Sequence, residues 1–229
     1  TWDGIVDVAA DYYEWSGGKA FLGIDSITSF MFVTAEQLGE SFYQMNDGKL
    51  EVQLSRDVAK KIWDTYYMPF IKGHYIAEGY YSSDDTKVGL NIGYIGSTAG
   101  ANYFPEEVLY NGDILPIENE TLPDPVHKGG QPVAIQQGAG MVVTKTDTAH
   151  EYAAVQFLKW FTAQEQNRQF AIATGYFPVK KEALGSSLLT ALQEQNPGAS
   201  PALTSSIQTT LDMYDNYHLL SFQAFDGSF

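Results

Sequence analysis

The sequence lacks several features that would narrow its function at once. None of its 229 residues is cysteine, so neither a disulfide nor a catalytic thiolate can form within it. No apolar stretch comes near the roughly 20 residues that a membrane-spanning helix needs. Any membrane anchor is therefore expected to come from outside this segment. Hydrophobic residues still make up 44% of the chain, enough for a sizeable core in one or two domains.

Basic residues are scarce. The chain has 13 Lys and Arg against 28 Asp and Glu, which gives a formal net charge of −15 at pH 7. This charge repels nucleic acids and anionic membrane surfaces, so neither is expected as a partner. It also disfavours a phosphorylated ligand unless a local basic group or a helix N-terminus offsets the repulsion. A neutral sugar meets no such obstacle.

Motifs of catalysis and metal binding are missing as well. The four histidines show no H-E-x-x-H or similar spacing, and there is no G-x-S-x-G elbow or phosphate-binding G-x-x-x-x-G-K-S/T loop. The pairs Asp84-Asp85 and Glu106-Glu107 could serve a glycosidase, but adjacent carboxylates in polar loops are far more often solvated. We therefore expect no catalytic residue, no cofactor and no metal site.

The most informative segment runs from residue 132 to residue 179. Its apolar run, 133–143, is interrupted by Gly138 and Gly140, which predicts a strand that another group approaches closely. Two short helices are predicted next, because two S/T-x-x-E spacings follow, in which a hydroxyl and a carboxylate satisfy free amides at a helix start. These spacings are Thr148 with Glu151 and Thr162 with Glu165.

The rest of the chain alternates between helical and extended patterns, which points to an α/β fold. Predicted helices begin at Thr1, at Asp25 or Ser26, and at Ser55, and others cover 181–184, 187–195 and 200–217. Predicted strands cover 20–24, 42–45, 50–54, 88–95 and 113–117, with Asn46-Asp47-Gly48 as a hairpin turn. Residues 73–87 are expected as a loop, and 121–131 as a linker.

Three blocks resemble bacterial extracellular solute-binding proteins and follow that family's order. They are TWDGIVDVAADYYE (1–14), YIGSTAGANYFPEEV (94–108), and the FLKWFT helix end followed by TGYFPV within 132–179. The similarity is to the sugar and glycerol-phosphate branch. It implies an α/β fold of the periplasmic-binding-protein-like type II, in which a ligand is held between two lobes.

The same resemblance implies that this chain is mostly the second lobe of a two-lobed receptor. Relatives are longer and begin with a secretion signal, whereas this sequence starts at Thr1 with neither Met nor an apolar leader. We expect 1–128 to be the first part of the second lobe, 129–175 a strand and helix pair of the first lobe, and 176–229 a helical return to the second lobe. The helix pair 148–172 would then expose an apolar face, through which self-association is possible.

Ligand contacts are expected where small and hydroxyl-bearing residues follow a strand. Ser97 and Thr98 are the first candidates, with an ordinary Ser/Thr turn as the alternative. Gly138 is placed by the resemblance near the cleft, with a buried strand and a glycine bulge as the alternative. Ser26 and Phe30 lie at a strand-to-helix corner, the usual place for ligands in such sheets.

Tyrosines near these segments are candidate platforms for the apolar faces of sugar rings. Tyr94 and Tyr103 are the preferred ones, and Tyr80 and Tyr81 are further candidates. The four tryptophans are expected in the core instead.

The resemblance implies an extracytoplasmic receptor of an ABC importer, either periplasmic or a cell-surface lipoprotein. Such a receptor binds a sugar or oligosaccharide and delivers it to the membrane permease without chemical change. A glycerol-phosphate type of ligand is the second possibility, and a secreted carbohydrate-active hydrolase is a remote third.

Overall fold

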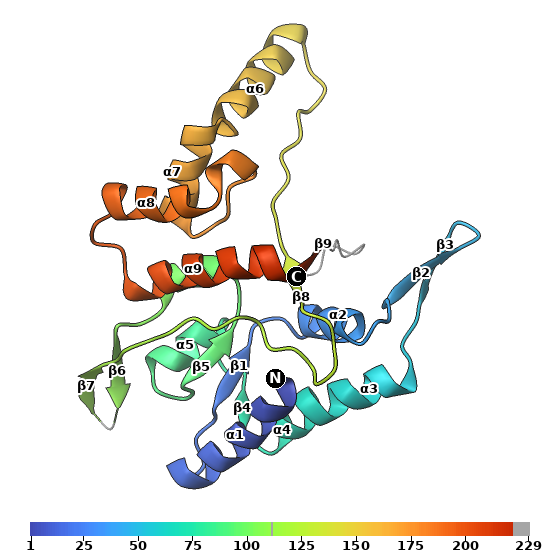
Figure 1. Cartoon of the computed structure of the whole chain (residues 1–229), viewed down its shortest axis with the longest axis vertical. Coiled ribbons are helices and arrows are strands. Elements are labelled where there is room, and N and C mark those ends of the chain that lie inside the picture. The colour runs from blue at the N-terminus through green and yellow to red at the C-terminus, as the bar shows by residue number, and fades with distance from the viewer. Residues whose placement is uncertain (111, 222–229) are drawn as a thin grey trace.

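The computed structural model describes residues 1–110 and 112–221, and the body of the molecule is built on a parallel sheet (Figure 1). The sheet has three strands in the order β4-β1-β5: Tyr75–Ile76, Leu22–Ile24 and Gly93–Ile95. Each parallel pair requires a crossover, which here contains helices. The α/β class is confirmed, but the expected strand 88–95 is real only in its last three residues.

Five helical segments precede or connect these strands. They are α1 (Trp2–Ser16), α2 (Ile27–Gln37), α3 (Arg56–Ile62), α4 (Met68–Ile71) and α5 (Ser82–Lys87), with a π-helical turn, Trp63–Tyr67, joining α3 to α4. Thr1 and Ser55 cap α1 and α3 through their hydroxyls, as predicted, and of the two residues predicted to cap α2 it is Ser26 that does so. The prediction of a loop at 73–87 was wrong, because β4 and α5 occupy it.

The core of the body forms where α1 and α2 pack on the sheet. Phe30 is 5% exposed and meets the edge of Trp2 with ring centroids 4.8 Å apart. The other buried members of this cluster are Ala9, Leu22, Ile24 and Tyr75. Burial was predicted correctly for Trp2 but wrongly for the other tryptophans, since Trp15, Trp63 and Trp160 are 82%, 51% and 55% exposed.

Two hairpins project from the body. β2 (Tyr43–Asn46) and β3 (Lys49–Val52) pair around Asp47 and Gly48, both at positive φ, as the Asn-Asp-Gly signal predicts. β6 (Glu107–Tyr110) pairs with β7 (Asp113–Pro116). The β7 prediction is confirmed, and β6 was missed.

The predicted strand 133–143 is confirmed only as β8 (Val133–Gln136). β8 pairs in parallel with β9 (His218–Ser221), a strand that the sequence pattern did not predict. Beyond Gln136 the chain has no regular structure and is exposed up to α6. The pattern was misleading there because a strand needs a partner, and among the described residues none lies beside 137–143. Of the predicted last segment, 222–229 lies outside the described residues.

The helices of the second half form a layer and a projecting arm (Figure 1). They are α6 (Thr148–Phe161), α7 (Gln164–Thr174), α8 (Ser186–Gln195) and α9 (Pro201–Asn216), with a 3-10 turn, Lys181–Ala183, before α8. α7, α8 and α9 share a second core, which includes Ile172, Leu188, Leu192, Leu203 and Ile207. α6 buries no residue at all and extends away from the body.

Both predicted capping boxes were wrong, although both helices exist. Asp147, not Thr148, caps α6, because its carboxylate accepts from the amides of Ala149 and His150. At the second box the Thr162 hydroxyl donates backwards to the carbonyl of Leu158 in α6, so it is not available as a cap for α7.

The predicted linker, 121–131, contains no helix or strand, but side chains hold its end firmly. The Gln37 amide donates to the carbonyls of Pro125 and Val133, both at 3.0 Å, and its oxygen accepts from the His127 amide at 2.9 Å. Gln37 is 1% exposed, so one buried side-chain amide adds to the few backbone bonds of this segment, such as those of Val126 with Trp2 and of Gln131 with Gln37.

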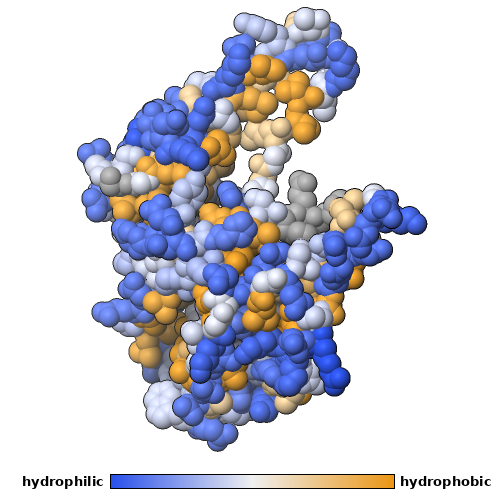
Figure 2. Space-filling view, turned by 45° about the vertical axis from the view of Figure 1, so that its right-hand side comes forward, coloured by the Kyte–Doolittle hydropathy of each residue, from blue (hydrophilic) through white to orange (hydrophobic). Residues whose placement is uncertain are grey.

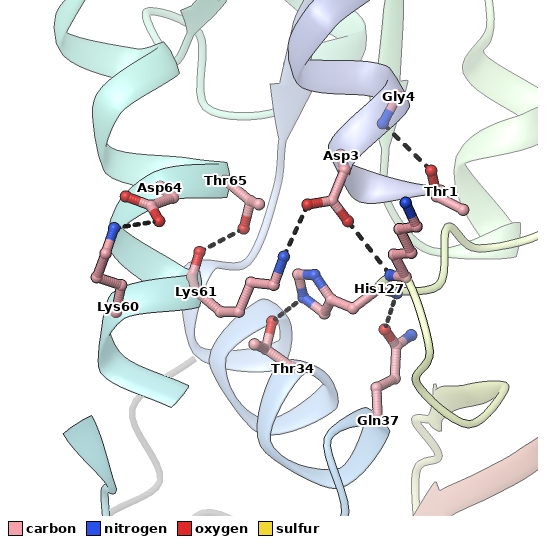
Figure 3. Close-up of polar contacts among 11 residues, drawn as sticks. Thr1, Asp3, Gly4, Thr34, Gln37, Lys60, Lys61, Asp64, Thr65 and His127 are labelled. Atoms are coloured by element: carbon pink, nitrogen blue, oxygen red, sulfur yellow. Dashed lines mark hydrogen bonds and ion pairs between the residues drawn. The ribbon is translucent and has the colours of Figure 1, made fainter. Parts of the chain in front are cut away.

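A charged pair secures the same segment from the other side (Figure 3). Asp3 of α1 accepts from Lys61 of α3 at 2.7 Å and from the Lys128 amide at 3.2 Å. His127 lies between these groups, 1% exposed, with its Nε2 3.1 Å from the Thr34 hydroxyl. Burial, and to a smaller extent the Lys61 charge, lowers the pKa of His127 to about 4.

This pKa predicts a pH-dependent stability. The unfolded chain protonates His127 near pH 6.5, whereas the folded chain resists protonation down to about pH 4, so stability falls as pH decreases through this window. The His127 contribution lost between pH 7 and pH 5 is about 2 kcal/mol. Urea unfolding at both pH values should show a His127→Gln variant losing less stability than wild type over this interval. The exposed His218 provides the control for the substitution itself, because His218→Gln should keep the wild-type difference. An unchanged difference in His127→Gln would contradict the prediction.

Candidate ligand site at the carboxyl edge of the sheet

Because β1, β4 and β5 are parallel, the three segments that follow them leave the sheet at one edge. These segments are Asp25-Ser26, 77–81, and Gly96-Ser97. In open parallel sheets this edge is where ligands bind, since adjacent loops there offer backbone and side-chain polar groups.

Asp25 links all three segments. Its carboxylate Oδ1 accepts from the Ser82 amide at 2.7 Å, and its own amide donates to the Ile95 carbonyl at 3.0 Å. The other carboxylate oxygen lies against Gly96, where an added Cβ would be only 2.3 Å from Oδ2. A side chain at position 96 would therefore force the Asp25 carboxylate to move.

Asp85 orders the loop after β4. Its two carboxylate oxygens accept from the amides of Glu78 and Gly79 at 3.2 and 2.8 Å. Asp85 is 3% exposed, so it lies beneath the loop and is not available to solvent. The loop is consequently held at both ends, by Asp85 near its start and by Asp25 at Ser82.

Tyr80 and Tyr81 project from this loop. They are 87% and 55% exposed, and their rings meet edge to face with centroids 4.7 Å apart. Two exposed aromatic faces on an ordered loop are suited to stacking on an apolar ring face.

Tyr94 and Tyr103, the preferred aromatic candidates, differ in exposure. Tyr94 is half-buried and stacked on Phe104, and its hydroxyl donates to the Gly100 carbonyl at 3.3 Å. Burial raises the pKa of Tyr94 to about 12, with a smaller contribution from the Asp25 charge, so its hydroxyl stays neutral. Tyr103 is 67% exposed at the end of a 3-10 helix, Thr98–Tyr103.

The hydroxyl candidates lie at this edge but also have local structural roles. The Ser97 hydroxyl accepts from the Ala99 amide and starts the 3-10 helix, and the Ser26 hydroxyl caps α2. Thr98 is half-buried where the end of α7 approaches, since a Cβ on Gly175 would lie 3.1 Å from the Thr98 carbonyl. Ser97 is exposed, and its hydroxyl can still donate to a ligand.

Two predicted residues are not placed at this edge. Phe30 is buried against Trp2 on the core side of α2, so its ring is not accessible to a ligand. Gly138 lies on the exposed segment after β8, and a Cβ there would have no described atom within 4 Å. Neither residue therefore belongs to the site proposed below.

Sequence reasoning missed Asp85 because it treated 73–87 as one loop. The run Ser82-Ser83-Asp84-Asp85 carried the missing signal, since hydroxyl and acidic residues are typical of a helix start. With α5 recognised, the tyrosine pair would have been placed directly before a helix that packs on the sheet.

Three further findings concern the described residues outside this edge. Among residues 1–110 and 112–221 no group of three or more His, Asp or Glu could hold a metal ion. A groove of about 540 Å³ lies mostly on the amino side of the sheet, although Ala77 and Glu78 from the segment after β4 also line it. Lys19 sits there 3.8 Å over the Tyr110 ring. Across the described part of the chain, no helix has the length and apolar character to cross a membrane.

The arm formed by α6 and α7 has an exposed apolar side, as expected. Figure 2 shows hydrophobic side chains on the arm beside the open space above the body. Among the exposed large apolar and aromatic side chains of α6 and α7, the exposed fraction ranges from 38% for Val155 to 64% for Tyr152. The other large members are Phe157, Trp160 and Phe170.

Comparison with known proteins agrees with this architecture. The sequence pattern of the family of bacterial extracellular solute-binding proteins matches this chain over residues 1–197. The chain belongs to that family. A search of curated protein sequences finds no match.

Solved structures show the same fold. The cyclic α-maltosyl-1,6-maltose binding protein from Arthrobacter globiformis aligns with a TM-score of 0.69 and 18% identity over 96% of this chain. Maltose-bound T. maritima MalE3 aligns with a TM-score of 0.65 and 17% identity over 97% of this chain. The alignments cover 54% and 55% of those two proteins, so this chain spans about half of their length. Both are named as binding proteins or sugar complexes, not as enzymes.

The close packing of α5 on β1 yields a prediction. A Cβ on Gly23 would lie 2.5 Å from the Ser82 Cβ, so Gly23→Ala must displace α5 and should cost about 1–3 kcal/mol of unfolding free energy. Gly138→Ala, with open space around it, should change stability much less. Guanidinium unfolding of both variants gives the comparison. Equal stabilities for the two would contradict the placement of α5.

Proposed function

We propose that this chain is part of the extracytoplasmic receptor of an ABC importer and that it binds a neutral sugar or oligosaccharide at the carboxyl edge of its sheet. The observation that carries the proposal is the exposed Tyr80-Tyr81 pair on an ordered loop beside Asp25. Membership of the solute-binding family supports it, and so do the maltose-type ligands in the names of the two similar structures.

The charges at this edge favour a neutral ligand. The segments 25–29, 77–86 and 94–104 contain four carboxylates and no Lys, Arg or His. A phosphate group would be repelled here, because Lys87, the basic residue that follows the second of these segments, already pairs with Asp84. A sugar can instead donate hydroxyls to carboxylate and carbonyl oxygens while its C–H face stacks on an aromatic ring. A glycerol-phosphate ligand is therefore the less favoured alternative.

Hydrolysis is not proposed. A glycosidase needs two carboxyl groups that reach the bond from opposite sides. Of the adjacent pair Asp84-Asp85, the buried Asp85 is occupied by two backbone amides, and Asp84 pairs with Lys87 at 3.3 Å. We propose binding without chemical change, followed by delivery to a membrane permease.

A division into two lobes is part of the same proposal. We propose that 1–128 belongs to one lobe and that β8 with the helix pair α6 and α7, within 129–175, belongs to the other. The unburied apolar side of the arm would then pack against the remainder of that lobe, which forms the opposite wall of the cleft. The segment after α7 would return to the first of these lobes. Self-association through the same apolar side stays a prediction.

Ligand binding can be tested by thermal shift with maltose, maltotriose and glycerol 3-phosphate. At one hundred times its Kd a ligand should stabilise the chain by about 2.7 kcal/mol, a Tm rise on the order of 5–10 °C. We expect a rise with a maltodextrin, and recovery of that sugar unchanged by chromatography.

Substitutions at the tyrosine pair test whether the sugar binds at this edge. Tyr80→Ala with Tyr81→Ala should remove most of the sugar-induced rise without lowering the Tm of the free protein, because both rings are exposed. Trp15→Ala is the control, since Trp15 is equally exposed at the end of α1 and distant from the loop in sequence. Sugar turnover would contradict the receptor proposal. A rise with glycerol 3-phosphate alone would change the ligand class.

A further inference from the structure

The start of α5 departs from the usual chemistry of a helix N-terminus. The residue in the N-cap position is Tyr81, whose side chain makes no capping hydrogen bond. Ser, Thr, Asp or Asn are preferred there, because their oxygens accept from the first free amides of the helix. Tyrosine at this position leaves the cap to be supplied from elsewhere.

Asp25 supplies it. This residue lies one position beyond the central strand β1, and its Oδ1 accepts from the Ser82 amide, the first of α5, at 2.7 Å. Ser82 is 4% exposed, so no water would readily replace this acceptor. The cap therefore comes from 57 residues away in the sequence.

The same carboxylate sets the spacing of the neighbouring loop. Its Oδ2 occupies the space that a side chain at position 96 would need. Asp25 thus touches the loop after β5 while it holds the end of the loop after β4. Both loops are fixed relative to the central strand by one side chain.

We propose that Asp25 is the positioning residue of the ligand edge: it caps α5 from another strand, which leaves position 81 free to present an aromatic ring next to Tyr80. Asp85 completes the arrangement from below by holding the amides of Glu78 and Gly79. The consequence for ligand binding rests on the proposed function, whereas the order of the loop does not.

Limited proteolysis with chymotrypsin measures how well the loop is ordered, because this protease cleaves after tyrosines that are exposed and can unfold locally. In Asp25→Ala we expect cleavage of the 81–82 bond to rise by about fivefold relative to cleavage at the exposed Tyr103, the effect of losing one cap. Asp25→Asn keeps an acceptor oxygen and should stay near the wild-type rate. Asp84→Ala, on the surface of the same helix, is the control and should also stay near that rate.

A double-mutant cycle keeps the test informative if Asp25→Ala folds poorly. Ser82→Pro removes the amide that Asp25 binds, at a first helical position where proline is tolerated, so Asp25→Ala should lower the Tm less in the Ser82→Pro background than in the wild-type background. Additive effects of the two substitutions would overturn the proposal. So would equal protection of the 81–82 bond in Asp25→Ala and wild type, or equal cleavage in Asp25→Asn and Asp25→Ala.

A ligand measurement separates this proposal from the proposed function. Isothermal titration with maltotriose should give at least a tenfold weaker Kd for Asp25→Ala, whereas Asp64→Ala, which removes a surface carboxylate outside this edge, should leave the Kd unchanged. If wild type binds no maltodextrin while the proteolysis result holds, the sugar assignment fails and the positioning role stands. If wild type binds and Asp25→Ala binds equally well despite a cleavable loop, the role of Asp25 in presenting the tyrosines is overturned.

Discussion

Parallel pairing of β1 with both of its neighbours is the constraint on which the rest of the candidate site depends. It sends the segments after all three strands to one edge of the sheet, so residues distant in sequence become neighbours there. Asp25 follows the middle strand and reaches both flanking loops, at Ser82 and at Gly96. The exposed tyrosine pair owes its fixed position to this geometry, because α5 begins directly behind it.

A second constraint acts where the chain leaves the body. The segment before β8 has no regular structure, and Gln37 binds it at Pro125 and His127 and binds β8 at Val133. Asp3 adds the Lys128 amide while it pairs with Lys61. These side-chain contacts give the segment 121–131 a defined path, although it is part of no sheet. In a receptor that closes about such a segment, these contacts would set the geometry from which closure starts.

Local signals in the sequence were sufficient where one short segment determines its own structure. The caps at Thr1 and Ser26 and the turn at Asp47 and Gly48 were predicted correctly, because each depends on neighbouring atoms. Features that depend on residues distant in the sequence were not predicted correctly. The apolar run after Gln136 reads as a strand but has no strand beside it, and the core position of Phe30 follows only from the packing of α2 on the sheet.

The residues of the candidate site also fall into those that the sequence could nominate and those whose roles needed the structure. Its hydroxyl and tyrosine side chains could be nominated from composition and from the resemblance, but the roles of Asp25 and Asp85 required α5 to be seen. The most direct test of ligand binding at this edge is an amide NMR titration with maltotriose. The account predicts the largest shift changes at Tyr81, Ser82 and Ser97, with small changes around the groove at Lys19. Largest changes at that groove, or none at saturating sugar, would contradict it.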